Sequence, residues 1–285
     1  MRASAFLAVD VGGSSVKSAF VTDGRVQQAV REPVARDLDG LVAQLERLAA
    51  QADEWGLCIA GLVEDGTVRY AVNLPLRETP LAELLTPRPR VVVNDLVAAT
   101  VGEAAGGTLA LLQVGTGIAA RCALEGRVLP GGEVGHLRFR DGGLPCRCGN
   151  RGCAEAYGAW GGILDRYAAA ARPEPTPSSL LAEAETDEWA AEVLADALEA
   201  IGCSAAALVA ACEPGTLRVG GGVAAAWGET LLEAVRRALR ERILPNVAAA
   251  TIVERAKLGD AAGLVGLAAL ARRSEVTADP ARTLG

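Results

Sequence analysis

Three cysteines and the only histidine of the chain stand close together near its middle. His136 precedes Cys146, Cys148 and Cys153 with the spacing H-x9-C-x-C-x4-C. Three thiolates and one imidazole form a closed tetrahedral set for Zn²⁺, which suits a structural site better than a catalytic one. An iron–sulfur cluster is a weaker alternative because it usually takes four cysteines, and a chance group of free thiols is another. The segment therefore predicts a zinc staple.

A glycine turn near the N-terminus could bind phosphate. It lies between two β-favouring runs, so it is neither a Walker loop nor a Rossmann turn. The backbone N–H groups of Gly12, Gly13 and Ser14 can converge on an anion. Asp10 could hold Mg²⁺ directly or through water, and Lys17 could add a positive charge near the phosphates. An ordinary hairpin explains this motif about as well when it is taken alone.

The strand–turn–strand pattern of residues 6–21 recurs in residues 109–124, 103 positions later. Its second turn is Gly115-Thr116-Gly117. A repeat of this length predicts two similar lobes, and their two turns could hold a polyphosphate between them. A third cluster, Gly220–Gly222, stands between a strand and a helix, where it permits close approach of a base or ribose. A tight strand-to-helix turn is an equally good explanation of the third cluster.

Asp95 follows the buried run that ends at Asn94. A carboxylate at the carboxyl end of a strand in an open α/β sheet could accept the proton of a hydroxyl that attacks a γ-phosphate. The alternative is that Asp95 caps a helix beginning at Leu96. Glu133 and Glu155 flank the cysteine cluster, and a zinc staple would fix them as rigid partners for a polyol. Solvated surface charges are the alternative for both.

Composition limits the class of protein. The 285 residues are 51% hydrophobic and 22% charged, which is typical of a globular chain, and the alternation of strands and helices predicts the α/β class. A net charge of −7 disfavours nucleic-acid and anionic-membrane partners. No secretory signal or membrane span is expected, so the predicted location is cytoplasmic. Four further cysteines are predicted to be small core residues: Cys58, Cys122, Cys203 and Cys212.

Taken together, the motifs resemble the ROK family (repressors, ORFs, kinases) along nearly the whole chain. The matching pieces are Asp10–Lys17, Asn94-Asp95, Gly115–Gly117, Gly131–His136, Cys146–Glu155 and Gly220–Gly222. The resemblance implies an α/β fold of two actin-like (ribonuclease H-like) lobes, with mixed sheets flanked by helices and the active site in the interdomain cleft. The N-terminal lobe is expected over residues 1–106, completed by a C-terminal helix at about 262–285, and the C-terminal lobe with the zinc motif over 107–261.

The resemblance also implies an ATP-dependent sugar kinase that uses Mg-ATP, carries structural Zn²⁺ and forms a homodimer. The 6-hydroxyl of a hexose would be the acceptor, and Asp95 would be the general base. Residue by residue, the sugar would be bound by Asn73, Asn94, Asp95, Glu133, His136 and Glu155. Mg-ATP would be bound by Asp10, Gly12, Gly13, Ser14, Lys17, Gly115, Thr116, Gly117, Gly220, Gly221 and Gly222.

Some positions depart from the family pattern. Ala60-Gly61 stands where Pro-Gly is usual, a tryptophan after the Asn73-Leu pair is missing, and residues 118–121 read Ile-Ala-Ala-Arg where more glycines are typical. The substrate is therefore left open between glucose, an N-acetylhexosamine, fructose and a sugar-like cyclitol. A non-catalytic sugar-binding regulator is a further alternative. A repressor is disfavoured because the first strand begins within ten residues, which leaves no room for a winged helix.

Overall fold

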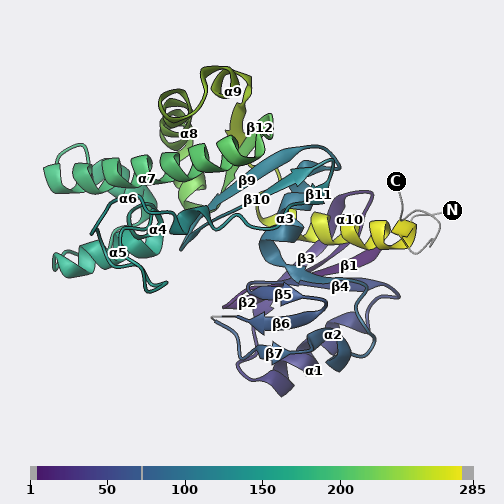
Figure 1. The fold of residues 1–285 in the computed structure, drawn as a ribbon. Helices are drawn as coiled ribbons and strands as arrows, with labels where there is room; N and C mark the ends of the chain where they lie inside the picture. The colour runs from purple at the N-terminus through teal and green to yellow at the C-terminus, as the bar shows by residue number, and fades with distance from the viewer. Residues whose placement is uncertain (1–4, 72, 278–285) are drawn as a thin grey trace. The chain divides into compact units, whose positions relative to one another are not determined.

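The computed structural model describes residues 5–71 and 73–277. The chain forms two compact units (Figure 1). Unit 1 comprises the chain up to Ala105 and again from Asp260, and unit 2 comprises Gly106–Gly259. The C-terminal helix therefore belongs to the same unit as the N-terminal strands.

Unit 1 is built on a five-stranded mixed sheet. Its strands lie in the order β3-β2-β1-β4-β8, with β1 antiparallel to β2 and parallel to β4. The central strand β1 is apolar along almost its whole length because both faces of the sheet are covered. The strands are β1 (Phe6–Val11), β2 (Ser15–Thr22), β3 (Arg25–Pro33), β4 (Trp55–Ile59) and β8 (Val92–Asn94).

Unit 2 repeats this sheet. Its order, β11-β10-β9-β12-β13, matches that of unit 1 position by position, including the antiparallel pair at the first turn and the parallel strands beyond it. The predicted α/β fold with two similar mixed sheets is therefore confirmed. The strands are β9 (Leu109–Val114), β10 (Ile118–Leu124), β11 (Arg127–Val128), β12 (Thr216–Gly220) and β13 (Ile252–Arg255).

Helices cover the sheet of unit 1 on both faces. One face packs against α1, which begins after its cap, Asp37, and buries its side chains Leu41, Leu45 and Leu48. The other face packs against the C-terminal helix. A small antiparallel sheet joins the first of these layers. The remaining elements are α1 (Leu38–Ala49), β5 (Leu62–Glu64), β6 (Thr67–Tyr70), β7 (Arg77–Thr79), α2 (Leu81–Leu84), α3 (Asp95–Ala104) and α10 (Ala262–Thr277).

Unit 2 has the larger helical layer. Its elements are η1 (Val134–His136), α4 (Glu155–Gly158), α5 (Trp160–Ala169), α6 (Pro177–Glu183), α7 (Glu188–Cys212), α8 (Gly222–Arg242) and α9 (Pro245–Ala250), and η2 (Gly259–Ala261) leads back into unit 1. By length and composition α7 could cross a membrane, but 61% of its most apolar window is buried inside the protein. Its apolar character is accounted for by the core, and the cytoplasmic location stays a prediction.

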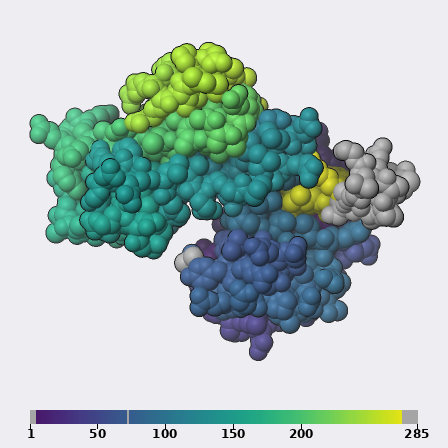
Figure 2. All heavy atoms as spheres, in the orientation of Figure 1, coloured from purple at the N-terminus to yellow at the C-terminus, as the bar shows by residue number. Residues whose placement is uncertain are grey.

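A cavity of about 480 Å³ lies in unit 2 beside α8, α9 and the start of β13. Its lining combines apolar side chains with Arg236 and Arg240. Helix α9 buries none of its residues, and the yellow-green region of Figure 2 shows this part of unit 2 at the surface. Strand β13 begins beside the cavity and runs parallel to β12. The cavity therefore lies near the amino ends of these two strands, whereas Gly220 is at the carboxyl end of β12.

Two glycines allow α3 and α10 to pack with their backbones in contact. A Cβ atom at Gly102 would lie 2.2 Å from the Ala262 carbonyl oxygen, and one at Gly266 would lie 1.7 Å from the Ala98 carbonyl oxygen. Neither oxygen can move without bending its helix. The C-terminal helix is therefore held to unit 1 by a contact that tolerates no side chain.

The variant Gly266→Ala is expected to destabilise the protein by about 1–3 kcal/mol or more, because the added methyl group forces the two helices apart. Gly263→Ala is the matched control, since it adds the same group to the same helix, where the nearest atom lies 3.4 Å away. The control is expected to be neutral or slightly stabilising. Chemical denaturation of both variants tests this, and equal midpoints would show that the close contact does not exist.

Candidate functional site

The first glycine turn places two predicted site residues side by side. The Gly12 N–H donates to the Ser15 carbonyl at 3.0 Å and closes the turn between β1 and β2. A Cβ atom at Gly13 would lie only 2.6 Å from Cβ of Asn73. Because of this close approach, the exposed Asn73, predicted to bind sugar, lies against the turn predicted to bind phosphate.

Asp10 occupies the end of β1, next to Cys58 in β4 and Lys17 in β2. The Cys58 thiol donates to Asp10 Oδ1 at 3.6 Å, and Lys17 Nζ lies 3.7 Å from Oδ2. Burial raises the pKa of Asp10, although the neighbouring ammonium of Lys17 opposes the rise. A carboxylate that is largely buried and only partly compensated by cations is a suitable ligand for a divalent metal ion.

Lys17 makes more contacts within the protein than the sequence suggested. Its Nζ donates to the Asp260 carbonyl at 2.8 Å and lies 3.6 Å from that residue's carboxylate, in addition to Asp10. Only 14% of its side chain is exposed. Lys17 therefore connects the first turn with the start of the C-terminal segment, and its contact with a phosphate stays a prediction.

Asn94 caps α3. Its Oδ1 accepts hydrogen bonds from the N–H groups of Leu96 and Val97 at 3.0 and 3.1 Å. Its Nδ2 donates to the Gly61 carbonyl at 2.9 Å and to Asp95 Oδ1, also at 2.9 Å. The alternative in which Asp95 is the cap is therefore wrong. Asp95 is the first residue of the helix, and its Oδ1 accepts a hydrogen bond from the Leu96 N–H at 2.9 Å.

The pKa of Asp95 is raised from 3.8 to about 6. Burial is the largest cause, the hydrogen bond from the Leu96 N–H opposes it, and the negative charge of Asp10 adds to it. A general base works best when its pKa lies near the working pH. Asp95 is thus a carboxylate that can accept a proton more readily than an exposed aspartate.

Cys58 is a neighbour of the candidate site that sequence reasoning missed. It was predicted to be a small core residue, and it is fully buried. Burial, together with the charges of Asp10 and Asp95, raises the pKa of its thiol well above the ordinary range, so it remains a donor. Its apolar neighbours in the sequence gave no signal of this. Only the register of β1 and β4, which places Cys58 opposite Asp10, reveals it.

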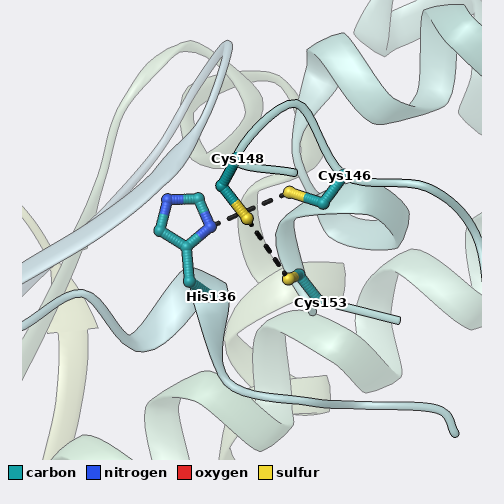
Figure 3. A group of neighbouring side chains, drawn as sticks. All are labelled: His136, Cys146, Cys148 and Cys153. Atoms are coloured by element: carbon teal, nitrogen blue, oxygen red, sulfur yellow. Dashed lines mark hydrogen bonds between the residues drawn. The ribbon is translucent and has the colours of Figure 1, made fainter. Parts of the chain in front are cut away.

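The four predicted metal ligands of unit 2 come together (Figure 3). Their ligand atoms all lie within 4.8 Å of one another. His136 Nδ1 is 3.8 Å from Cys146 Sγ, and Cys148 Sγ is 3.7 Å from Cys153 Sγ. Two sulfurs bound tetrahedrally at ~2.3 Å from one zinc ion would be ~3.8 Å apart. The donor set and its spacing therefore fit a four-coordinate metal ion.

Backbone hydrogen bonds shape the loop that carries these thiols. The Cys146 N–H donates to the Asn150 carbonyl at 2.8 Å, and the Gly149 N–H donates to the Cys146 carbonyl at 2.9 Å. Gly149 and Gly152 have φ values of +93° and +75°, and a Cβ atom at Gly152 would lie 1.7 Å from the Arg140 carbonyl oxygen. Glycines are needed here because the chain turns tightly around the ligand atoms.

Glu155 connects the metal cluster to the second glycine turn. Its Oε2 accepts from the Ile118 N–H at 2.9 Å, and its Oε1 lies 3.9 Å from His136 Nδ1. A Cβ atom at Gly117 would lie 2.7 Å from the same Oε2. Three predicted pieces, the turn, the glutamate and the histidine, therefore meet within unit 2.

Glu133 precedes η1, and 65% of its side chain is exposed.

The second and third glycine clusters are also neighbours. The Gly115 N–H donates to the Gly117 carbonyl at 3.0 Å, and the Gly161 N–H donates to the Thr116 carbonyl at 3.1 Å. Gly221 has φ +95°, and a Cβ atom there would lie 2.3 Å from the Val114 carbonyl oxygen. The start of α8, at Gly222, therefore lies beside the second turn, where helix N–H groups favour an anion.

The raised pKa of Asp95 has a consequence for stability. A carboxyl group with a raised pKa in the folded state opposes folding by a penalty that grows as the pH rises above about 4, is complete above the folded pKa of about 6, and disappears well below pH 4. Asp95→Asn is therefore expected to stabilise the protein at pH 8 by up to about 3 kcal/mol, and most of the gain should be lost at pH 4.

Denaturation midpoints at pH 8 and pH 4 measure this gain. Asp23→Asn removes an exposed carboxylate from a turn and is the control, for which no gain is expected. The explanation would be wrong if Asp95→Asn and the wild type had the same midpoint at pH 8.

Comparison with known proteins places this geometry in a family. Residues 6–274 match the ROK family. A glucokinase from Halalkalibacterium halodurans is 29% identical over 95% of this chain and 96% of its own length. An N-acetylmannosamine kinase from Pasteurella multocida is 31% identical over 92% of this chain and 94% of its own length.

A solved structure supports the same assignment. The ROK hexokinase from Thermus thermophilus matches with a TM-score of 0.82 and 31% identity, over 96% of this chain and 99% of that chain. The resemblance predicted from the glycine, aspartate and cysteine motifs is confirmed. The chain belongs to the ROK family.

Proposed function

We propose that the protein is an ATP-dependent sugar kinase that uses Asp95 as its general base. The observation that carries this proposal is the Asp95 carboxylate itself, which follows the Asn94 cap and which burial keeps at a pKa of about 6 against the hydrogen bond from the Leu96 N–H. The activities named for its relatives, a glucokinase and an N-acetylmannosamine kinase, support the same reaction class.

In the proposed reaction Asp95 accepts the proton of a sugar hydroxyl as its oxygen attacks the γ-phosphorus of ATP. The bond from that phosphorus to the β-phosphate oxygen breaks, and ADP leaves with the electron pair. Asp10 would hold Mg²⁺, which neutralises charge on the phosphates when it is bound. The hydrogen-bond donors of the protein then need only orient the phosphates, while the surrounding protein excludes water.

The other roles are proposed from the family resemblance, with support from contacts inside each unit. We assign the phosphates to the two glycine turns, and the nucleoside to the third cluster, because Gly221 permits close approach beside the second turn. The sugar is assigned to a set of amide, carboxylate and imidazole groups that can exchange hydrogen bonds with hydroxyls. That set is Asn73, Asn94, Asp95, Glu133, His136 and Glu155.

The zinc ion is proposed to have a structural role only, with no part in the chemical step. The closed set of three thiolates and one imidazole leaves no open position for a substrate or water. Binding the ion would fix His136, and with it the neighbouring carboxylate of Glu155. The ion would thereby order the sugar-binding segment of unit 2. The homodimer implied by the family resemblance stays a prediction.

The acceptor is proposed to be a hexose or N-acetylhexosamine, phosphorylated on its 6-hydroxyl. The named relatives act on different sugars, so the family does not fix which one this chain prefers. The departures at Ala60 and in residues 118–121 lie next to the predicted sugar and phosphate groups, and they leave Asp95 and the zinc ligands intact.

Measurement of ADP release with Mg-ATP across glucose, mannose, fructose, N-acetylglucosamine, N-acetylmannosamine and cyclitols tests the activity. Turnover is expected on at least one of these. Asp95→Ala is expected to lower kcat by about 10²–10⁴-fold while sugar binding, measured by calorimetry, is weakened but persists, because the base is lost and the other five groups of the sugar-binding set remain. A folded, metal-loaded protein that binds a sugar and releases no ADP would identify a regulator and refute the kinase.

Metal analysis tests the zinc proposal. The purified protein is expected to carry about one zinc ion per chain, and Cys148→Ser, which alters the exposed thiol of the set, is expected to lose it. The KM for sugar should rise in that variant. Cys203→Ser removes a thiol outside the cluster and serves as the control. Equal zinc content in wild type and Cys148→Ser would overturn the assignment.

A further inference from the structure

Arg121 is a charged residue in a largely buried position. It lies in β10, just beyond the second glycine turn, between the buried residues Ala120 and Cys122. Only 16% of its side chain is exposed. A charged group this far buried must find partners, so its contacts indicate what it does.

The guanidinium group of Arg121 contacts the segment Gly131–Glu133. Its Nη1 donates to the carbonyl of Gly131 and, at 2.9 Å, to that of Ala120. Its Nη2 lies 3.6 Å from Glu133 Oε1. One side chain thus holds both the backbone of the turn and the carboxylate that follows it.

The backbone of this turn can exist only with glycine. Gly131 and Gly132 have φ values of +89° and +106°. The Ala120 N–H donates to the Gly132 carbonyl at 3.0 Å, and a Cβ atom at Gly132 would lie 2.0 Å from the Ala120 carbonyl oxygen. Two glycines make a flexible connection, so contacts must restrict it if Glu133 is to have a fixed position. The backbone bond between Ala120 and Gly132 restricts one side of the turn, and Arg121 adds a side-chain contact at Gly131.

The contacts of the guanidinium group distinguish between two roles for Arg121, one in binding ATP and one in positioning the sugar-binding segment. A residue next to a phosphate-binding turn could contact ATP. The two terminal nitrogens, however, are used on the turn that leads into Glu133 and His136. The contacts therefore connect Arg121 to the sugar-binding segment rather than to the phosphates.

We propose that Arg121 is a positioning residue for sugar recognition, which fixes the Gly131–Gly132 turn and orients the carboxylate of Glu133 toward the sugar hydroxyls. This rests on the proposed function, in which Glu133 binds the sugar. A freely rotating carboxylate would lose conformational freedom on binding, whereas one held by Arg121 is already ordered. Arg121 thus acts through Glu133 and does not touch the substrate.

The test compares steady-state kinetics of Arg121→Met and Arg121→Lys with the wild type. Arg121→Met keeps the length of the apolar stem and removes the donors, so the KM for sugar is expected to rise about tenfold or more. The KM for ATP and kcat should stay within about twofold, since neither the phosphates nor the base is touched. Arg121→Lys should restore part of the affinity, because it keeps the charge without the fork of donors.

A double-mutant cycle with Glu133→Gln distinguishes positioning from a general loss of stability. If Arg121 acts through Glu133, the double variant should raise the KM for sugar by clearly less than the product of the single effects. Arg218→Met is the control: Arg218 is an equally buried arginine of the same sheet, paired with Glu254 at 2.8 Å. It should lower the melting temperature and leave the KM for sugar unchanged.

Three results would overturn the proposal. The first is a rise in the KM for ATP without one for sugar. The second is a lower melting temperature with unchanged KM values, as in Arg218→Met. The third is multiplicative effects in the cycle. If the wild type phosphorylates no sugar, the proposed kinase fails instead, and the same variants are then judged by calorimetric sugar binding, where Arg121→Met should still weaken affinity about tenfold.

Discussion

The side chain of Asn94, and not that of Asp95, caps α3, and the chemistry proposed for unit 1 depends on this. A capping aspartate would give its carboxylate oxygens to the free N–H groups of the first helical turn, which lowers its pKa. With the cap supplied by the preceding amide, burial dominates and the pKa of Asp95 rises to about 6. The same amide donates to Gly61, so it also ties the loop after β4 to the end of β8.

Each unit uses the ends of its strands in the same way. In unit 1 the Asp10 carboxylate and the turn after it lie at the end of β1, and Asp95 follows β8, which is separated from β1 by β4 in the same sheet. In unit 2 the turn after β9 lies beside Gly221, and Glu155 joins it to the four metal ligands. Glycines at these positions are required by close approach of other atoms, the Glu155 carboxylate at Gly117 and the Val114 carbonyl at Gly221, so the proposed binding groups are held by fixed contacts.

Much of the fold and of the candidate site could be predicted from the sequence because the signals are local. The repeat of strand, glycine turn and strand predicts two similar sheets, and the spacing of His136 and its cysteines predicts their convergence. The sequence could not assign the α3 cap, because Asn94 and Asp95 are both good capping residues. Nor could it reveal Cys58 beside Asp10 or Arg121 beside Glu133, since both contacts depend on strand register and on backbone turns between residues far apart in the chain.

The pH dependence of the initial rate, with sugar and Mg-ATP both held well below their KM values, tests the role of Asp95 most directly. Under these conditions the profile reports the ionisation of the free enzyme. The rate is predicted to be constant between pH 7 and 8 and to fall about tenfold per pH unit below about pH 6, as the buried carboxylate becomes protonated. A rate that stays level from pH 8 to pH 5 in the folded enzyme would contradict the assignment of Asp95 as the general base.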